Sequence, residues 1–264
     1  MGRASGSHSA RHETVVLASG GGADGRTCTG NASANTKGTW VTSSAFKPSF
    51  TWNMMRVSLL NASAADYTVD IGIDDGSGNV YVICPDLRLP GLRASRTGFC
   101  HYLLPLHVEK DKQFAFRCAD TTGGLQARVT IGGSSNGLYG AQGYSRMVAL
   151  YSPSLSAGVA VDPGGSASTK GSWSQLTASS SDRVVAIMGA IGHNADISRA
   201  ANQSMLLDIG IGGAGSERVL VPDIHFGADT NQDQWSPITF GPYPCDVPSG
   251  TRFAARSACD VTTA

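Results

Sequence analysis

Apolar and polar residues alternate along two stretches of the chain that read almost identically. In YTVDIGID at 67–74, Val69, Ile71 and Ile73 fall on one side, and MLLDIGIG at 205–212 repeats the pattern. A period of two predicts a β-strand with one face buried. We therefore expect the same kind of strand in both halves of the chain.

A glycine-rich turn and a return strand follow each stretch. The turns are DDGSGN and GGAGSE, and the apolar runs VYVIC and RVLV come directly after them. Glycine supplies the positive φ values that tight β connections need, so each half is predicted to contain a hairpin. Pro85 and Pro222 lack a backbone N–H and are expected to end the return strands.

The two hairpins belong to a longer internal duplication. Three further pairs of segments match in the same order: NTKGTW at 35–40 with STKGSW at 168–173, PLHVEKDKQFAFRCA at 105–119 with PCDVPSGTRFAARSA at 244–258, and, more weakly, ETVVLAS at 13–19 with SRMVALYS at 145–152. Fixed-period similarity of this kind indicates a repeated structural unit. We place the units at residues 13–133 and 145–264, with a mobile N-terminal arm at 1–12 and a Gly/Ser-rich linker at 134–144.

The apolar runs predict about six to eight strands per unit at short spacings, the pattern of an antiparallel sandwich or jelly roll. The fold class expected is all-β, with two tandem antiparallel β-sandwich (jelly-roll-like) units; one closed barrel built from both units is the alternative. The only segment with a helical pattern is NADISRAANQSM at 194–205. LQARVTIGG at 125–133 has no counterpart in the second unit, whose open sheet edge we expect a neighbouring chain or another segment to cover.

Composition and charge agree with a turn-rich β protein and exclude some partners. The chain has 264 residues, of which 41% are hydrophobic, 15% are charged and 33 are glycine. Lys plus Arg and Asp plus Glu number 20 each, so no net charge favours binding to nucleic acid or a membrane surface. The N-terminus lacks an apolar signal core, and the apolar run at 184–192 is far shorter than the roughly 20 residues of a membrane-spanning helix. We expect synthesis in the cytoplasm.

Six cysteines are present without any C-x-x-C pair, which argues against zinc and thioredoxin-like sites. Buried free thiols and disulfides formed after release both remain open. Cys100 and Cys118 flank a hairpin whose turn is expected near Lys110, so they form a candidate disulfide.

Candidate catalytic residues are weak. Residues 133–137 match G-x-S-x-G, but no helix pattern follows and the surrounding GGSSNG has the composition of a linker. His101 and His107 nominally share a face, yet the second unit keeps neither histidine, which favours solvated or packing roles. The sequence therefore predicts no catalytic residue, and we expect no enzyme activity.

Candidate metal ligands are equally weak. Asp70, Asp74 and Asp75, with nearby Ser77 and Asn79, offer oxygens, but the spacing is not that of a calcium loop. The stretch reads more simply as a turn. No metal site and no cofactor are predicted.

The residues that both units retain are expected to be structural. They comprise the aspartate of each DIGI stretch, an arginine matched in both units as a candidate ion-pair partner, and a tryptophan expected to anchor the core: Asp70, Asp208, Arg117, Arg256, Trp40 and Trp173.

The combination KGSW, DIGIGGAGSE, VPDI and VPSGTRFAAR resembles a group of structural proteins encoded by tailed bacteriophages and prophages, in which such units occur singly or in tandem. The resemblance covers most of both units, and the first departs from it with DDGSGN and HVEKDKQFAFR. It implies a β-sandwich fold and a virion role as head decoration, neck or tail accessory, or fibre attachment. It implies no active site.

The function expected is that of a non-enzymatic structural component of a phage particle, located in the virion. Its partners would be other virion proteins of the capsid, neck or tail, in a homo-oligomer or symmetric assembly. The alternative is a carbohydrate- or receptor-binding module, for which exposed aromatic residues near Trp52, Tyr139, Tyr144 or Trp235 would be the signature. An enzyme such as a depolymerase or esterase ranks third.

Overall fold

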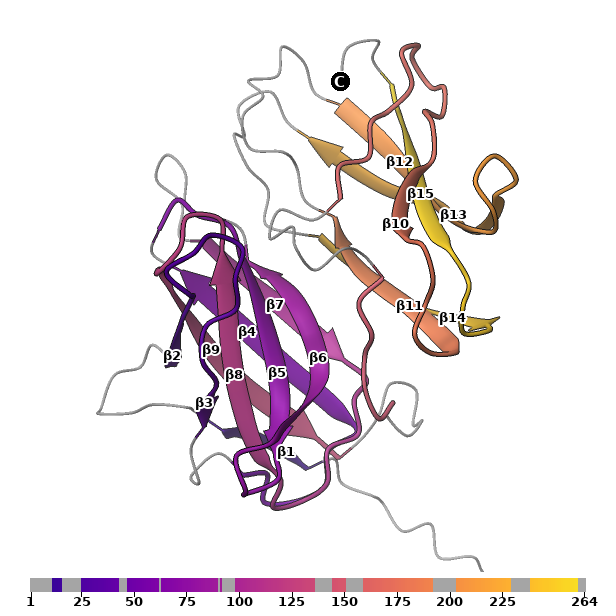
Figure 1. Cartoon of the computed structure of the whole chain (residues 1–264). Coiled ribbons are helices and arrows are strands. Elements are labelled where there is room, and N and C mark those ends of the chain that lie inside the picture. Colours follow the sequence, from indigo (N-terminus) through magenta and orange to yellow (C-terminus); the bar gives the residue numbers. More distant parts are fainter. Residues whose placement is uncertain are drawn as a thin grey trace, which may run out of the picture.

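The chain folds as an all-β protein in a computed structural model, with its strands gathered into two β-sandwiches (Figure 1). The structure describes residues 11–15, 25–42, 47–61, 63–89, 91, 98–135, 144–150, 159–191, 203–228 and 238–260. The predicted fold class is confirmed. No helix in these ranges is long and apolar enough to cross a membrane.

The first sandwich consists of two sheets that pack face to face. One sheet has the order β1–β9–β4–β7, with β2 also paired to β9: β1 (His12–Val15), β9 (Gln126–Ser134), β4 (Met54–Asn61), β7 (Gly98–Leu104) and β2 (Arg26–Thr29). The other has the order β3–β8–β5–β6: β3 (Val41–Thr42), β8 (Gln113–Asp120), β5 (Tyr67–Asp74) and β6 (Val80–Leu89).

The second sandwich repeats this plan with fewer described strands. Its larger sheet has the order β10–β15–β12–β13: β10 (Ser174–Thr177), β15 (Phe253–Cys259), β12 (Gln203–Ile211) and β13 (Arg218–Ala228). The smaller sheet pairs β11 (Val184–Ile191) with β14 (Ile238–Val247).

The core of each sandwich lies between its sheets. In the first, Val69 and Ile71 are fully buried on the predicted inner side of β5, together with the rings of Trp52, Tyr67 and Phe114. Full burial of one such side chain stabilises the fold by about 1.5–3 kcal/mol. The second core is smaller and is built from Val184, Ile187, Leu207, Ile209, Val221, Ile224, Val247, Phe253 and Ala255.

The strands of the two halves correspond in order and pairing. The four-stranded sheets β3–β8–β5–β6 and β10–β15–β12–β13 match strand by strand, and the chain order matches β4 with β11 and β7 with β14. β4 pairs with both β7 and β9, whereas among the described strands β11 pairs with β14 alone. The described part of the second half therefore holds no counterpart of β9.

Two details differ from the sequence predictions. Pro85 and Pro222 lie inside β6 and β13 and do not end them, because both strands are sheet edges with a bulge at the proline, where a missing N–H is tolerated. The segment 194–205, predicted to be helical, ends in the first residues of β12, and its earlier part lies outside the described residues.

The proposed unit boundaries remain a prediction, because residues 1–10 and 136–143 lie outside the described ranges. Ser134, placed in the linker, is the last residue of β9. Residues 144–150 run between the sandwiches, where Met147 packs against the first core and Val148 and Leu150 pack against the second. The N–H of Met147 donates to the carbonyl of Ile83 at 2.7 Å, which attaches this segment to the edge of β6.

Candidate functional site: a repeated lysine, aspartate, arginine and tryptophan cluster

Asp70 is the centre of the first cluster. It lies directly opposite Arg117 in the pairing of β5 with β8, and Arg117 Nε donates to Asp70 Oδ2 at 2.8 Å. Lys37 Nζ donates to the other carboxylate oxygen, Oδ1, at 2.7 Å. The backbone N–H of Asp86 donates to the same oxygen at 2.9 Å. Three hydrogen-bond donors thus compensate the carboxylate of Asp70 for the loss of water, since the residue is only 3% exposed.

Asp208 is the centre of an equivalent cluster in the second half. Arg256 Nε donates to Asp208 Oδ2 at 2.9 Å, and Lys170 Nζ donates to Oδ1 at 2.7 Å. The backbone N–H of Asp223 donates to Oδ1 at 3.0 Å. The two clusters agree atom by atom, so the duplication preserves a complete hydrogen-bonding unit.

A bulge supplies the backbone donor in each cluster. The register between β5 and β6 shifts between Val69 and Ile71, so that Pro85 and Asp86 together oppose Asp70. Asp86 has φ 54°, a left-handed conformation that aspartate tolerates better than most residues. Asp223 repeats it with φ 48°. The repeated Pro-Asp pair therefore directs a backbone N–H at the central carboxylate.

The tryptophans cover the clusters from outside. The Arg117 guanidinium lies 4.4 Å from the ring centroid of Trp40, and that of Arg256 lies 4.6 Å from that of Trp173. Such stacking adds a favourable cation–π contact. Both rings are only half-buried, so the prediction that they anchor the core is wrong. They lie outside the core because the same sheet face carries Asp70, Asp208 and their partners.

The glycine of each K-G motif permits a close backbone approach. A Cβ atom at Gly38 would clash with the carbonyl oxygen of Thr29, and one at Gly171 would clash with that of Asp162. The N–H of Gly38 donates to the Cys118 carbonyl at 2.8 Å, and that of Gly171 donates to Ser257 at the same distance. The motif thus holds its lysine and tryptophan against the neighbouring strand.

The carboxylate of Asp208 is held in its charged form by the groups around it. Burial alone would raise the pKa of Asp208, but hydrogen bonds from the Asp223 N–H, Lys170 and Arg256 outweigh it and hold the pKa below its ordinary value. A carboxylate kept charged by two cations and a backbone donor suits a structural ion cluster. It lacks the raised pKa expected of a general acid or base at neutral pH.

Lys37, Lys170, Asp86 and Asp223 were missed as cluster members. Each lies in a matched anchor, the lysines in the K-G-x-W motifs and the aspartates in the Pro-Asp pairs. The signal that could have identified them is that both copies of a motif retain the same polar residue. The sequence does not show that the lysine side chains extend across the sheet to Asp70 and Asp208.

The surroundings of the two clusters differ. In the first half, Lys37, Asp70 and Arg117 line a hollow of about 340 Å³ together with residues 146–149 and Ser181. The Asp86 side chain is only 6% exposed there. The equivalent Asp223 side chain is 60% exposed. The two clusters therefore differ in exposure at the bulge aspartate, while their lysines, central aspartates and arginines are about equally exposed.

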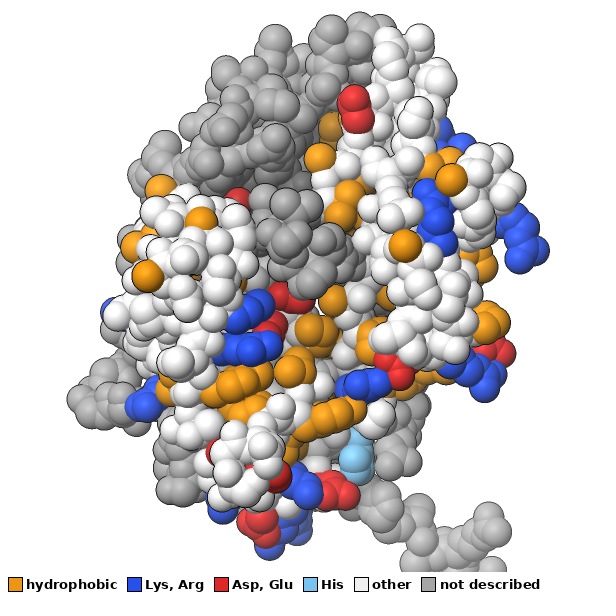
Figure 2. Space-filling model, in the orientation of Figure 1, with side chains coloured by type: hydrophobic (Ala, Val, Ile, Leu, Met, Phe, Trp, Pro, Cys, Tyr) orange, Lys and Arg blue, Asp and Glu red, His pale blue; other side chains and the backbone are white. Residues whose placement is uncertain are grey.

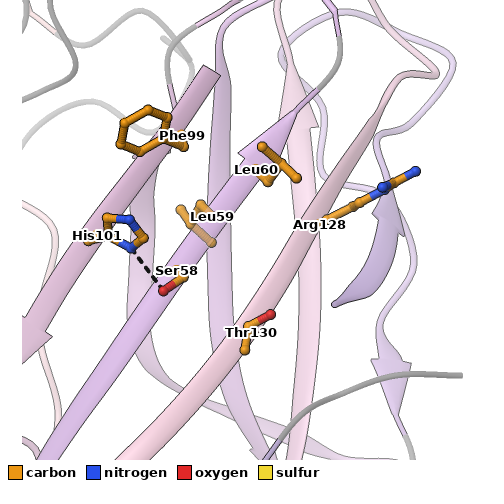
Figure 3. Close-up of a pocket in the computed structure, with 7 residues that line it drawn as sticks. All are labelled: Ser58, Leu59, Leu60, Phe99, His101, Arg128 and Thr130. Carbon is orange, nitrogen blue, oxygen red and sulfur yellow. Dashed lines mark hydrogen bonds between the residues drawn. The ribbon is translucent and has the colours of Figure 1, made fainter. Parts of the chain in front are cut away.

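A second hollow, of about 240 Å³, lies on the outer face of the sheet formed by β9, β4 and β7. Its lining comes from all three strands: Ser58, Leu59, Leu60, Phe99, His101, Arg128 and Thr130 (Figure 3). His101 Nδ1 and Ser58 Oγ share a hydrogen bond of 2.9 Å, and the Phe99 ring lies 5.6 Å from that of His101. Phe99 is 46% exposed, so the hollow combines an accessible aromatic ring with polar groups.

The candidate disulfide between Cys100 and Cys118 is absent. The two residues lie on β7 and β8, which belong to opposite sheets, because the chain between them crosses from one sheet to the other and does not form a hairpin. All six cysteines are free. The Cys118 thiol donates to the carbonyl of Cys28 at 3.2 Å. A hydrogen bond with Cys118 and burial raise the pKa of the Cys28 thiol.

The remaining candidates occupy ordinary structural positions. Ser135 Oγ accepts a hydrogen bond from the Arg11 backbone N–H, and its neighbours Asn136 and Gly137 lie outside the described residues. His107 Nδ1 shares a hydrogen bond of 2.7 Å with Asn53 Oδ1. Asp75 holds the hairpin turn, and hydrogen bonds from Ser77 lower its pKa to about 2.

Among the aromatic residues that would mark a ligand-binding module, Trp52 is fully buried and Tyr144 is 37% exposed. Tyr139 and Trp235 lie outside the described residues. Within the described ranges, no group of three or more His, Cys, Asp or Glu side chains is arranged to hold a metal ion.

No protein-family model and no curated protein matches the sequence. Among solved structures, the chain is similar to a viral major capsid protein, the STIV MCP, at 11% identity and a TM-score of 0.29, over 97% of each chain. It is also similar to the N-terminal CBM22-1–CBM22-2 tandem of Paenibacillus barcinonensis Xyn10C at 11% identity and a TM-score of 0.27. That likeness covers 96% of this chain and 90% of the other. At these TM-scores neither likeness carries an argument about this protein.

Proposed function

We propose that this protein is a non-enzymatic structural component of a bacteriophage particle that binds other virion proteins through its β-sandwich surfaces. The observation that carries the structural role is the repeated cluster. The polar residues that the duplication retains hydrogen-bond one another and fix the sheet, so what the chain repeats is a scaffold. The resemblance of the repeat motifs to tailed-phage structural proteins supports the setting in a particle.

The exposed surface fits a role in protein contacts. Large hydrophobic side chains are exposed on both sandwiches and on the segment between them: Tyr81, Phe99, Leu103, Tyr144, Val185, Val219 and Tyr243. Figure 2 shows basic and acidic side chains interspersed on one face with hydrophobic ones between them, in keeping with the zero net charge. Exposed apolar residues rimmed by charges of both signs are typical of protein interaction surfaces.

Head decoration and neck or tail accessory are the positions that suit such a protein, with synthesis in the host cytoplasm and a final location in the virion. Quantitative mass spectrometry of particles from the phage or induced lysogen that carries the gene tests the proposal. We expect the protein in the particle at a fixed ratio to the major capsid protein. Copies on the order of hundreds indicate head decoration or a tail lattice, and about a dozen indicate a neck or fibre. Absence from purified particles overturns the proposal.

A carbohydrate- or receptor-binding module is the second candidate, favoured by the hollow that contains Phe99. A half-exposed ring beside His101 and Ser58 offers one apolar face and several hydrogen-bonding groups. If this candidate is correct, Phe99→Ala should weaken binding to a glycan found by array screening at least tenfold, about 1.4 kcal/mol. Leu103→Ala is the control, because Leu103 is 53% exposed on the same strand and does not line the hollow. Absence of binding to any glycan contradicts this candidate.

A further inference from the structure

β6 and β13 are equivalent edge strands whose surroundings differ. Each pairs with one strand of its sheet, and the registers make Val82 equivalent to Val219 and Cys84 equivalent to Val221. The two strands share a sequence pattern and a bulge, and they pair with the equivalent strands β5 and β12. A difference in side-chain exposure between them therefore indicates a difference in what lies over each strand.

β6 is covered by the segment that enters the second sandwich. The Met147 N–H donates to the Ile83 carbonyl at 2.7 Å, and the Cys84 thiol lies 3.5 Å from the Met147 sulfur. Residues 146–149 and Ser181 also line the hollow beside the first cluster. Cys84 is fully buried in the first core, against which Met147 also packs.

β13 presents the same surface uncovered. Val219 is 44% exposed, whereas its equivalent Val82 is half-buried. Asp223, which forms the bulge, has a side chain that is 60% exposed, tenfold more than the 6% of its equivalent Asp86. Among the described strands β13 pairs with β12 alone. Within the described residues, the edge that is covered in the first half is therefore open in the second, and open edges are templates for further pairing.

We propose that the open edge of β13 docks a second copy of this chain, in the way that β6 docks the segment that enters the second sandwich. The equivalent entry segment of another copy leads into its first sandwich, where ETVVLAS at 13–19 matches SRMVALYS at 145–152. The backbone of β1, within that segment, pairs with β9, and no other described strand pairs with it. Among the described strands β1 therefore has one unpaired edge, and the proposal pairs this edge with β13.

Charge favours this occupant. Arg146 lies over the ring of Tyr81 at 5.8 Å, and the residue of β13 at the position of Tyr81 is the exposed Arg218. A second arginine from a docking segment would be repelled there. The sequence match places Glu13 at the position of Arg146, which is of opposite sign to Arg218.

The contact joins two different surfaces of the chain, and such heterologous contacts build rings or open chains. The inference rests on the proposed function for its setting, because a ring or chain of copies suits a particle component. The interface itself is a property of the purified chain.

Analytical ultracentrifugation of the full chain over increasing concentration, up to about 1 mM, tests the inference, since an association of only about 4 kcal/mol shows in that range. We expect reversible self-association that Val219→Lys weakens at least tenfold. Val185→Lys is the matched control, because Val185 is also 44% exposed in the second sandwich but lies on β11. Unchanged circular dichroism and melting of both variants show that the fold is retained.

Hydrogen–deuterium exchange identifies the two surfaces. Association should protect the amides of residues 218–223 and of residues 12–15 together. Protection of 218–223 alone indicates a symmetric contact of two β13 edges and overturns the head-to-tail arrangement. A chain that stays monomeric, or equal association of both lysine variants, overturns the inference.

These outcomes are separate from the test of function. If the protein is present in particles but its Val219→Lys variant associates like the wild type, this inference is wrong and the proposed function still holds. If the protein is absent from particles but still associates through β13, the proposed function is wrong and this inference holds.

Discussion

Replacing Asp208 by Asn should destabilise the second sandwich by about 3 kcal/mol, a loss of roughly 10 °C in melting temperature. Asparagine keeps the shape but not the charge, and its NH₂ group presents a donor to Lys170 or Arg256, which are donors themselves. Their side chains are 20% and 30% exposed, so two half-buried cations lose their common partner. Because they keep some contact with water, we expect the lower end of the 3–5 kcal/mol typical of broken buried ion pairs.

Urea unfolding monitored by circular dichroism measures this loss. Asp246→Asn is the matched control: Arg183 Nε lies 2.6 Å from Asp246 Oδ1, but both side chains are about two-thirds exposed. Exposed pairs of this kind contribute about 0–1 kcal/mol. Equal effects of the two substitutions would show that the Asp208 cluster does not support the fold.

The effect of Asp208→Asn should also depend on pH in a defined direction. The folded-state pKa of Asp208 lies below its ordinary value of 3.8, because hydrogen bonds from the Asp223 N–H, Lys170 and Arg256 together outweigh burial. A lowered pKa means that the stabilisation is fully present above pH 3.8 and is lost as the pH falls through the folded-state pKa. The stability difference between wild type and variant should therefore be constant near neutral pH and shrink below about pH 4.

Much of the fold could be predicted because its rules are local. The alternation in YTVDIGID and MLLDIGIG places Val69, Ile71, Leu207 and Ile209 in the cores, where the structure has them. The paired motifs indicate that both halves use one architecture, and the four-stranded sheets of the two halves repeat the same strand order. Strand period and repeated turns depend on neighbouring residues, which a sequence displays directly.

The cluster could be predicted only in part, because its geometry is not local. Asp70, Arg117 and their second-half equivalents are recognisable as retained polar residues, but Lys37 reaches Asp70 from a covering segment that no periodicity reveals. Pro85 resembles a strand end because the bulge that accommodates it exists only within the paired sheet. The same limitation made the disulfide prediction wrong, since spacing along the chain does not say that β7 and β8 lie in opposite sheets.

Gly210→Ala should destabilise the second sandwich by about 1–3 kcal/mol although it adds a single methyl group. A Cβ atom at this position would meet the Trp173 ring at 2.5 and 2.7 Å and the Arg218 carbonyl oxygen at 3.1 Å. The ring cannot withdraw freely, because Arg256 lies over it at 4.6 Å and is itself bonded to Asp208. The Trp173 ring therefore packs directly against the backbone of Gly210, where no side chain would fit.

Thermal and urea unfolding of Gly210→Ala, set beside Gly165→Ala, measure this constraint. Gly165 lies in an exposed bend with no atom within 4 Å of the added Cβ, so its substitution should be close to neutral. A double-mutant cycle assigns the cause: in a Trp173→Ala background the methyl group meets no ring, and Gly210→Ala should cost at least 1 kcal/mol less, about a fivefold change in the folding equilibrium. If Gly210→Ala lowers the free energy of unfolding by the same amount in that background, the backbone carbonyl of Arg218, and not the tryptophan, excludes a side chain from this position. The K-G-x-W motif and the DIGI glycine would then be retained for separate reasons.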